Sequence, residues 1–121
     1  MNQIIIADDD ASMRDIFQLI LQRAGYTVTL YADGEVLLGN GYRVPDLFIL
    51  DKQLSGVDGL DICRFLKSQE STKNIPVIII SASPYVANHA GDAGAEAFVE
   101  KPFKTKELLE VIKKYITINN N

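Results

Sequence analysis

Charged side chains follow three short apolar runs of this chain, at the points where each run ends. They are Asp8 and Asp9 after residues 3–7, Asp51 after residues 47–50, and Lys101 after residues 97–100. If the runs are neighbouring parallel strands, their carboxyl ends meet at one edge of a sheet. Carboxylates about 4 Å apart, at an effective dielectric of about 20, repel by roughly 4 kcal/mol per pair. A divalent cation is therefore expected to bridge them, with Mg²⁺ preferred and Mn²⁺ as a substitute.

The residue types at this edge suit the transfer of a phosphoryl group. Asp51 is placed as a nucleophile that would form an acyl phosphate, and the backbone carbonyl of Gln53 can complete the metal's oxygen ligands. The hydroxyl of Ser81, which ends another apolar run, can donate to a phosphoryl oxygen. Asp10 lies nearest the following helix and is expected to cap it. The competing interpretation, ordinary caps and loop acids, does not explain why Lys101 meets this cluster.

Short apolar runs alternate with amphipathic segments along the whole chain. The predicted strands are residues 3–7, 27–30, 47–50, 77–80 and 97–100, and the predicted helices are 11–24, a weak 34–38, 60–68, a weak 84–93, and a last helix capped by Thr105 through about residue 116. This alternation predicts an α/β fold, a doubly wound five-stranded parallel sheet covered on both faces. A cis bond between Lys101 and Pro102 is a further expectation.

Composition narrows the functional classes. The chain has 121 residues, of which 47% are hydrophobic, and we expect one domain over residues 1–116 with a flexible tail at 117–121. The net charge of −4 disfavours direct binding of nucleic acid. Cys63 is the single cysteine, which fits a reducing, cytoplasmic compartment, and no apolar stretch is long enough to cross a membrane.

Taken together and in order, these motifs resemble the receiver domain of two-component response regulators over residues 2–116. The pieces that carry the resemblance are IIIADDD, LFILD, VDG, IIISAS, GAEAF and EKPF. The resemblance implies a flavodoxin-like sheet with strand order 2-1-3-4-5. It also implies a stand-alone switch, similar to the chemotaxis regulators, that signals through contact with an unidentified protein target.

The resemblance also implies a role for each site residue. Asp51 would accept the phosphoryl group from a phosphohistidine on a histidine kinase or a histidine phosphotransfer protein. The implied metal ligands are Asp8, Asp9, Asp51 and the backbone carbonyl of Gln53, and the implied catalytic and switch residues are Ser81, Lys101 and Phe98. Gln53 and Ser83 match the positions that tune the rate of dephosphorylation. Such a protein assists its own phosphorylation and dephosphorylation but is not a turnover enzyme.

Some residues depart from the family pattern. Ser55 stands where the family usually has proline, which predicts a looser turn, and Lys52 adds positive charge beside Asp51. The weak helix at 84–93 leaves open a receiver-like interaction module that is never phosphorylated. A Mg²⁺-dependent phosphohydrolase is also possible, although Gln53 replaces the second acid such enzymes often carry. A flavodoxin-like electron carrier is a third alternative, but the aspartates that follow residues 3–7 would repel the phosphate of FMN.

Overall fold

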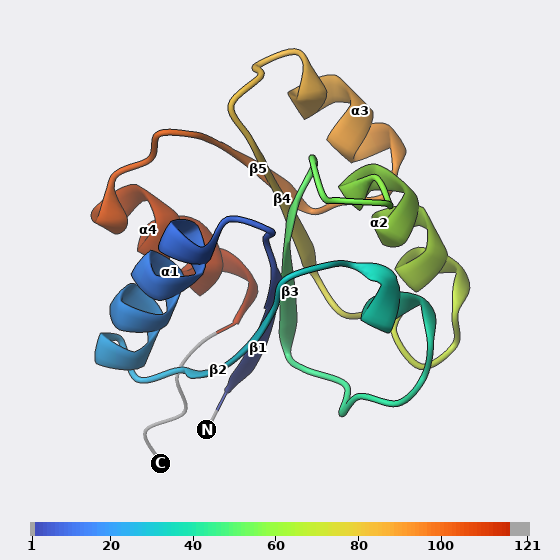
Figure 1. The fold of residues 1–121 in the computed structure, drawn as a ribbon, viewed down its shortest axis with the longest axis horizontal. Helices are drawn as coiled ribbons and strands as arrows, with labels where there is room; N and C mark the ends of the chain where they lie inside the picture. Colours follow the sequence, from blue (N-terminus) through green and yellow to red (C-terminus); the bar gives the residue numbers. More distant parts are fainter. Residues whose placement is uncertain (1, 117–121) are drawn as a thin grey trace.

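The computed structural model describes residues 2–116, which form one five-stranded parallel sheet with helices on both faces (Figure 1). The strand order is β2-β1-β3-β4-β5, as expected. In chain order the elements are β1 Gln3–Ala7, α1 Ala11–Arg23, β2 Thr27–Tyr31, the 3₁₀ helix η1 Glu35–Leu38, β3 Leu47–Asp51, α2 Gly59–Ser68, β4 Val77–Ser81, α3 Val86–Asp92, β5 Ala97–Glu100 and α4 Thr105–Tyr115. The tail predicted at 117–121 lies outside the described residues.

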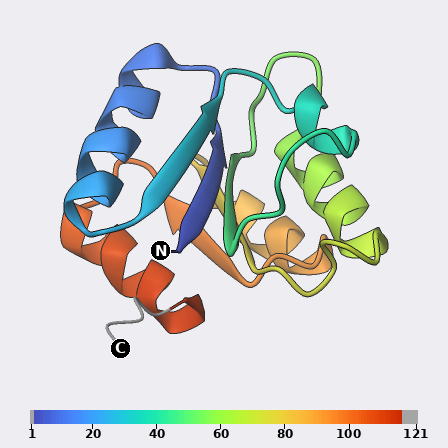
Figure 2. The ribbon, with the colours of Figure 1, turned by 90° about the horizontal axis from the view of Figure 1, so that it is seen from below.

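Each inner strand supplies side chains to two cores because successive strand residues point to opposite faces. Along β3, Phe48 and Leu50 pack into the core beneath η1, α2 and α3, whereas Leu47 and Ile49 pack into the core beneath α1 and α4. Figures 1 and 2 show these two groups of helices on opposite sides of the sheet. A strand buried on both faces needs a continuous apolar run, which is why these strands could be predicted from the sequence.

Helix ends are defined by local hydrogen bonds, and most match the expectations. Asp10 is the N-cap of α1, where its side chain accepts from the Ser12 N–H. Gly25 ends α1 at a φ of 97°, and the N–H of Tyr26 donates back to Leu21 in a Schellman motif. This conformation is open to glycine at little steric cost.

Three local expectations need correction or refinement. Thr105 does not cap α4: Lys104 occupies the N-cap position without a side-chain bond, and Thr105 is the first helical residue. The weak segment at 34–38 forms the four-residue 3₁₀ helix η1. The weak segment at 84–93 is helical over Val86–Asp92, because two of its side chains, Val86 and Ala90, are buried against the sheet.

No helix within residues 2–116 is long and apolar enough to cross a membrane.

Candidate functional site

The ladder of the sheet continues past the strand ends and holds the backbone of the site residues. The N–H of Asp8 donates to Tyr31, that of Lys52 to Ile80, and that of Lys101 to Ser81, at 3.1, 2.9 and 2.9 Å. The register pairs Asp51 with Ile80 and Ala7 with Leu50. Asp51 at the end of β3, and the residues after β1 and β5, are therefore held at the same edge of the sheet, as the sequence predicted.

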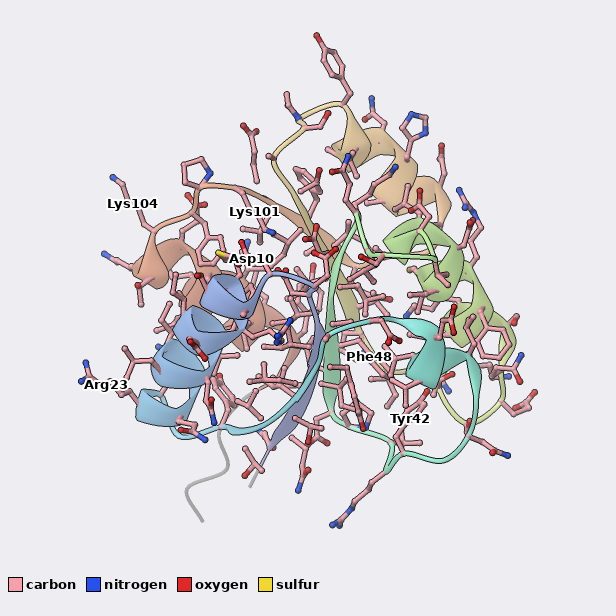
Figure 3. All side chains as sticks on the ribbon, in the orientation of Figure 1. Asp10, Arg23, Tyr42, Phe48, Lys101 and Lys104 are labelled. Carbon is pink, nitrogen blue, oxygen red and sulfur yellow. The ribbon has the colours of Figure 1, made fainter. Side chains whose placement is uncertain are left out.

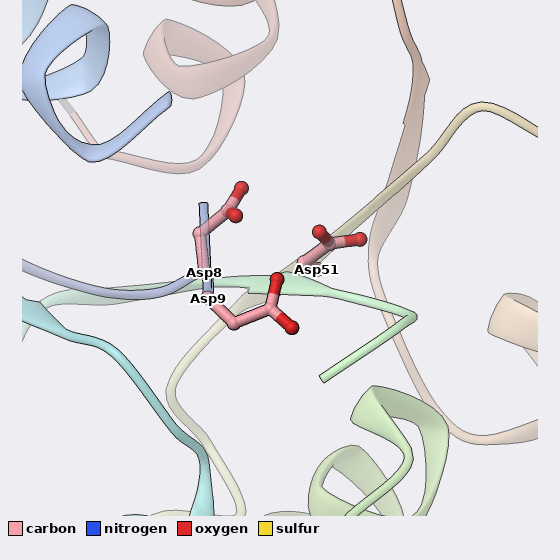
Figure 4. Close-up of side chains that lie close together, drawn as sticks. All are labelled: Asp8, Asp9 and Asp51. Atoms are coloured by element: carbon pink, nitrogen blue, oxygen red, sulfur yellow. The ribbon is translucent and has the colours of Figure 1, made fainter. Parts of the chain in front are cut away.

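Three carboxylates meet at this edge (Figure 4). One oxygen each from Asp8, Asp9 and Asp51 lies within 4.8 Å of the other two. Asp8 is buried, Asp51 is 9% exposed, and Asp9 is exposed. The cluster is thus anchored in the protein on one side and accessible from solvent on the other.

Asp8 is held by contacts from two directions. Its Oδ1 accepts from the Asp10 N–H at 2.9 Å, its Oδ2 accepts from Lys101 Nζ at 3.2 Å, and Arg14 donates to its backbone carbonyl at 2.8 Å. Burial raises the pKa of the Asp8 carboxyl, and the charge of Asp51 adds to this. The Asp10 N–H and Lys101 lower the pKa, but they offset only part of the rise. The contacts around Asp8 therefore compensate its ionised form only in part.

Lys101 joins the two buried acids. Its Nζ lies 3.0 Å from Asp51 Oδ2 as well as 3.2 Å from Asp8 Oδ2, and the following bond to Pro102 is cis, as expected. Burial lowers the pKa of the Lys101 ammonium. The hydrogen bond and charge of Asp51, followed by those of Asp8, raise this pKa by more than burial lowers it, so the pKa of Lys101 lies above its ordinary value. Lys101 is therefore held in its charged form.

The carboxylates open into a cleft of about 470 Å³. Its lining consists of Asp9, Asp10, Asp51, Gln53, Ser81, Ala82, Ser83 and Lys101. The Gln53 N–H donates to Asp51 Oδ1 at 3.2 Å, and the Ser81 hydroxyl accepts from the Ser83 N–H at 3.1 Å. The structure therefore brings together Asp8, Asp9, Asp51, Gln53, Ser81, Ser83 and Lys101.

Phe98 lies apart from this cleft. It is half-buried on β5, opposite Ile79 of β4, and packs against the core beneath α2 and α3. Its role as a switch stays a prediction.

Comparison with known proteins identifies the family. The family model described as the response regulator receiver domain matches residues 4–113, which is most of the chain. The chain is a response regulator receiver domain. This is the family that the motifs resembled.

Curated relatives with similar sequences include transcriptional regulators. The receiver domain is 35% identical over 120 residues to the alkaline phosphatase synthesis transcriptional regulatory protein SphR of Synechococcus elongatus, covering 89% of this chain and 46% of that protein. It is 35% identical over 118 residues to the DNA-binding dual master transcriptional regulator RpaA of Synechocystis, covering 93% and 48%. The chain thus spans about half the length of the curated relatives it matches.

Solved structures agree on the fold. A response regulator from Chloroflexus aurantiacus superimposes with a TM-score of 0.89 at 31% identity, covering 94% of this chain and 96% of that one. The chemotaxis response regulator CheY4 of Vibrio cholerae gives 0.87 at 26% identity, covering 96% and 99%. A sensor histidine kinase receiver domain from Pseudomonas aeruginosa, which has a magnesium ion coordinated in its active site cleft, gives 0.86 at 26%, covering 94% and 96%.

Membership in this family places the chain among the signalling proteins of two-component systems, which partner with histidine kinases, rather than among turnover enzymes. Receiver domains bind a divalent metal, and the donor set here fits one. Among residues 2–116, the ion pairs of these three carboxylates are those of Lys101 with Asp8 and with Asp51, so negative charge is left over where their oxygens converge. Carboxylate oxygens are the ligands that hard divalent cations prefer.

Sequence reasoning missed three contacts around this receiver site. Arg14 binds the backbone of Asp8, Lys52 pairs with Asp58 at 2.9 Å, and the Ser55 hydroxyl donates to Asp9 Oδ2 at 3.0 Å. The looser turn expected at Ser55 stays a prediction, and the structure adds a hydrogen bond that ties this turn to the site. The only signal for Ser55 in the sequence was its departure from the usual proline.

Proposed function

We propose that Asp51 accepts a phosphoryl group from a phosphohistidine on a partner histidine kinase or histidine phosphotransfer protein. The observation that carries this is the position of Asp51: nearly buried, held between Lys101 and the acidic pair, and facing an open cleft of about 470 Å³. A nucleophile held in one geometry beside its substrate gains rate because less orientational freedom is lost during reaction.

The transfer is a direct displacement at phosphorus. One carboxylate oxygen of Asp51 attacks, the P–N bond to the donor imidazole breaks as the new P–O bond forms, and the imidazole leaves with the electron pair of the broken bond. Asp8, Asp9, Asp51 and the carbonyl of Gln53 would hold the metal, for which we propose Mg²⁺. Bound there, Mg²⁺ would neutralise charge on the phosphoryl oxygens. Lys101 already lies 3.0 Å from Asp51 and can pair with the same oxygens.

The response to phosphorylation is proposed to start at Ser81 and Lys101. A phosphoryl group brings about −1.5 to −2 charge and three acceptor oxygens to Asp51. The Ser81 hydroxyl, which lines the cleft, is free to donate to one of them while still accepting from the Ser83 N–H. Phe98, two strand positions before Glu100, would then change rotamer and shift the population of the surface around α3, β5 and α4. Gln53 and Ser83 flank the acyl phosphate and would tune its lifetime.

We propose that the kinase docks on an apolar groove beside the site. Met13, Ile16 and Ile20 of α1 line this groove together with Lys101 and Phe103 from the connection after β5, around a volume of about 440 Å³. Ile16 is 44% exposed, although it belongs to the apolar stripe of α1. Because Lys101 lines both this groove and the phosphoacceptor cleft, a partner seated here would present its histidine to Asp51.

The domain is proposed to span residues 1–116. Its output is proposed to pass through contact with a protein target, and a net charge of −4 argues against direct contact with nucleic acid. The DNA-binding activity after which some relatives are named would then belong to the half of those proteins that this chain does not match. A cytoplasmic location is proposed because the single cysteine, Cys63, is buried and unpaired.

The test is phosphorylation by a small donor. Purified protein is incubated with Mg²⁺ and acetyl phosphate, and its intact mass is measured beside that of Asp51→Asn. We expect the wild type to gain one phosphoryl group, and we expect EDTA or the substitution to abolish the gain. A wild type that gains nothing, from acetyl phosphate or from a phosphorylated kinase, would refute the proposal and favour an interaction module that is never phosphorylated.

A further inference from the structure

Ser55 makes a hydrogen bond that crosses the mouth of the site. Its hydroxyl donates to Asp9 Oδ2 at 3.0 Å, although the two residues are 46 positions apart in the sequence. Asp9 belongs to the connection after β1, and Ser55 belongs to the connection between β3 and α2. The bond therefore joins the connection that carries Asp8 and Asp9 to the connection that carries Gln53.

Asp9 is the least supported of the three carboxylates. Asp8 receives the Asp10 N–H and Lys101, and Asp51 receives the Gln53 N–H and Lys101. Within residues 2–116, the hydrogen bond recorded for the Asp9 side chain is the one from Ser55. Asp9 is also exposed, so without Ser55 its carboxylate would sample several rotamers in water.

The Ser55 loop is itself tied down at its other end. Lys52 and Asp58 form an ion pair at 2.9 Å, and Asp58 caps α2 by accepting from the Leu60 N–H at 2.8 Å. Gln53 lies between these anchors and forms an isolated bridge with Asp58. Ser55 therefore orients Asp9 from a loop that is itself held in place.

We propose that Ser55 is a positioning residue that presets Asp9 as a metal ligand and holds the Gln53 loop against it. The hydroxyl occupies one lone pair of Oδ2, so Oδ1 and the second lone pair of Oδ2 stay available to a cation. Outer hydrogen bonds of this kind orient metal-binding carboxylates and strengthen binding. A proline at this position, as is usual in the family, has no hydroxyl to donate. The inference rests on the proposed metal site.

The test compares metal affinity in four proteins: wild type, Ser55→Ala, Ser55→Thr, and Ser71→Ala as an exposed control distant from the cleft. Mg²⁺ binding is measured by titration calorimetry, and Mn²⁺ binding by the paramagnetic resonance signal of the free ion. Ser55→Ala should weaken both about three- to tenfold, less than the 10–100-fold typical of outer partners, because Ser55 is exposed. Ser55→Thr keeps the hydroxyl and should restore the affinity, and Ser71→Ala should leave it unchanged. Urea denaturation in EDTA should show all four equally folded.

The outcomes separate the inference from the proposed function. If the wild type binds Mg²⁺ and Ser55→Ala binds it equally well, the positioning role is overturned while the metal site stands. If Ser55→Thr is as weak as Ser55→Ala, the loop and not the hydroxyl is responsible, and the role is again overturned. A wild type that binds neither ion would overturn both.

Discussion

Replacing Lys101 by methionine removes the cation that lies between Asp51 and Asp8. At 3.0 and 3.2 Å, and with an effective dielectric of about 20, each pair is worth roughly 5 kcal/mol of attraction before desolvation. Burying the ammonium cancels much of this. Removing one partner of a buried pair typically costs 3–5 kcal/mol, and Lys101 keeps one fifth of its side chain exposed. We therefore expect the metal-free variant to lose about 3 kcal/mol of stability.

The same substitution should tighten Mg²⁺ binding. Lys101 competes electrostatically with a divalent ion for Asp8 and Asp51, so its removal leaves these carboxylates more attractive to Mg²⁺. A tenfold lower Kd corresponds to about 1.4 kcal/mol, so the loss of stability should fall from about 3 to about 1.6 kcal/mol at saturating Mg²⁺. Phosphorylation by acetyl phosphate should nevertheless be slower, because the lysine is lost from the phosphoryl group.

The assay is urea denaturation followed by circular dichroism, in EDTA and in Mg²⁺, together with calorimetric titration of Mg²⁺. Lys104→Met is the control, because Lys104 belongs to the same connection but lies exposed at the periphery (Figure 3). The electrostatic reasoning is refuted if the metal-free stability of Lys101→Met stays within about 0.5 kcal/mol of wild type, the range of ordinary surface substitutions. It is equally refuted if Mg²⁺ binds more weakly.

Three further predictions follow from single side chains. Folding raises the pKa of Asp8, so the ionised carboxylate costs stability above that pKa. In EDTA at pH 7, Asp8→Asn should therefore unfold at a higher urea concentration than the wild type. This gain in stability should shrink as the pH falls toward 3.8, the ordinary pKa of an aspartate. A Cβ on Gly59 would overlap the backbone carbonyl of Asp51, so Gly59→Ala should lose about 3 kcal/mol of unfolding free energy in urea denaturation. A Cβ on Gly91, within α3, would meet open space, so Gly91→Ala should gain about 0.5–1 kcal/mol. Ile16→Glu should slow phosphotransfer from the partner kinase and leave the rate with acetyl phosphate unchanged.

Each of these can fail in a distinct way. Asp8→Asn that is less stable than wild type at pH 7 would mean that the bond to Lys101 outweighs burial. If alanine at Gly59 and at Gly91 changed the unfolding free energy equally, the end of β3 would have to move aside from the Gly59 Cβ at no cost. If Ile16→Glu slows both donors, or neither, the groove on α1 is not where the kinase docks. Val36→Glu, an exposed apolar residue of η1 on the opposite side of the sheet, is the control.

The strands and the charged edge could be predicted because burial leaves a strong mark on the sequence. Buried parallel strands require short continuous apolar runs, and the strand bounds differ from the predicted ones by at most one residue. Once the strands run parallel, their ends must meet, so Asp8, Asp9, Asp51 and Lys101 could be placed together from topology alone. Side-chain rotamers were not needed for this step.

Helix boundaries were less predictable because tertiary packing overrides local preference. Residues 84–93 carry poor helix formers, yet the burial of Val86 and Ala90 and the left-handed Gly94 are enough for a seven-residue helix. At α4 the buried side chains of Leu108 and Ile112 set the helix against the sheet. The chain then enters the helix at Lys104, and the capping preference of Thr105 has no effect.

Contacts between loops leave no periodic mark at all, and Ser55 shows why this matters for function. The Ser55–Asp9 bond spans 46 residues and depends on how two connections fold back over the sheet edge, which neither spacing nor residue type encodes. A proline at the same place would fit the turn equally well by sequence rules, but it could not donate to Asp9. The family pattern therefore identifies which residues react, whereas the geometry of this chain's own loops determines how firmly Asp9 is held for the metal.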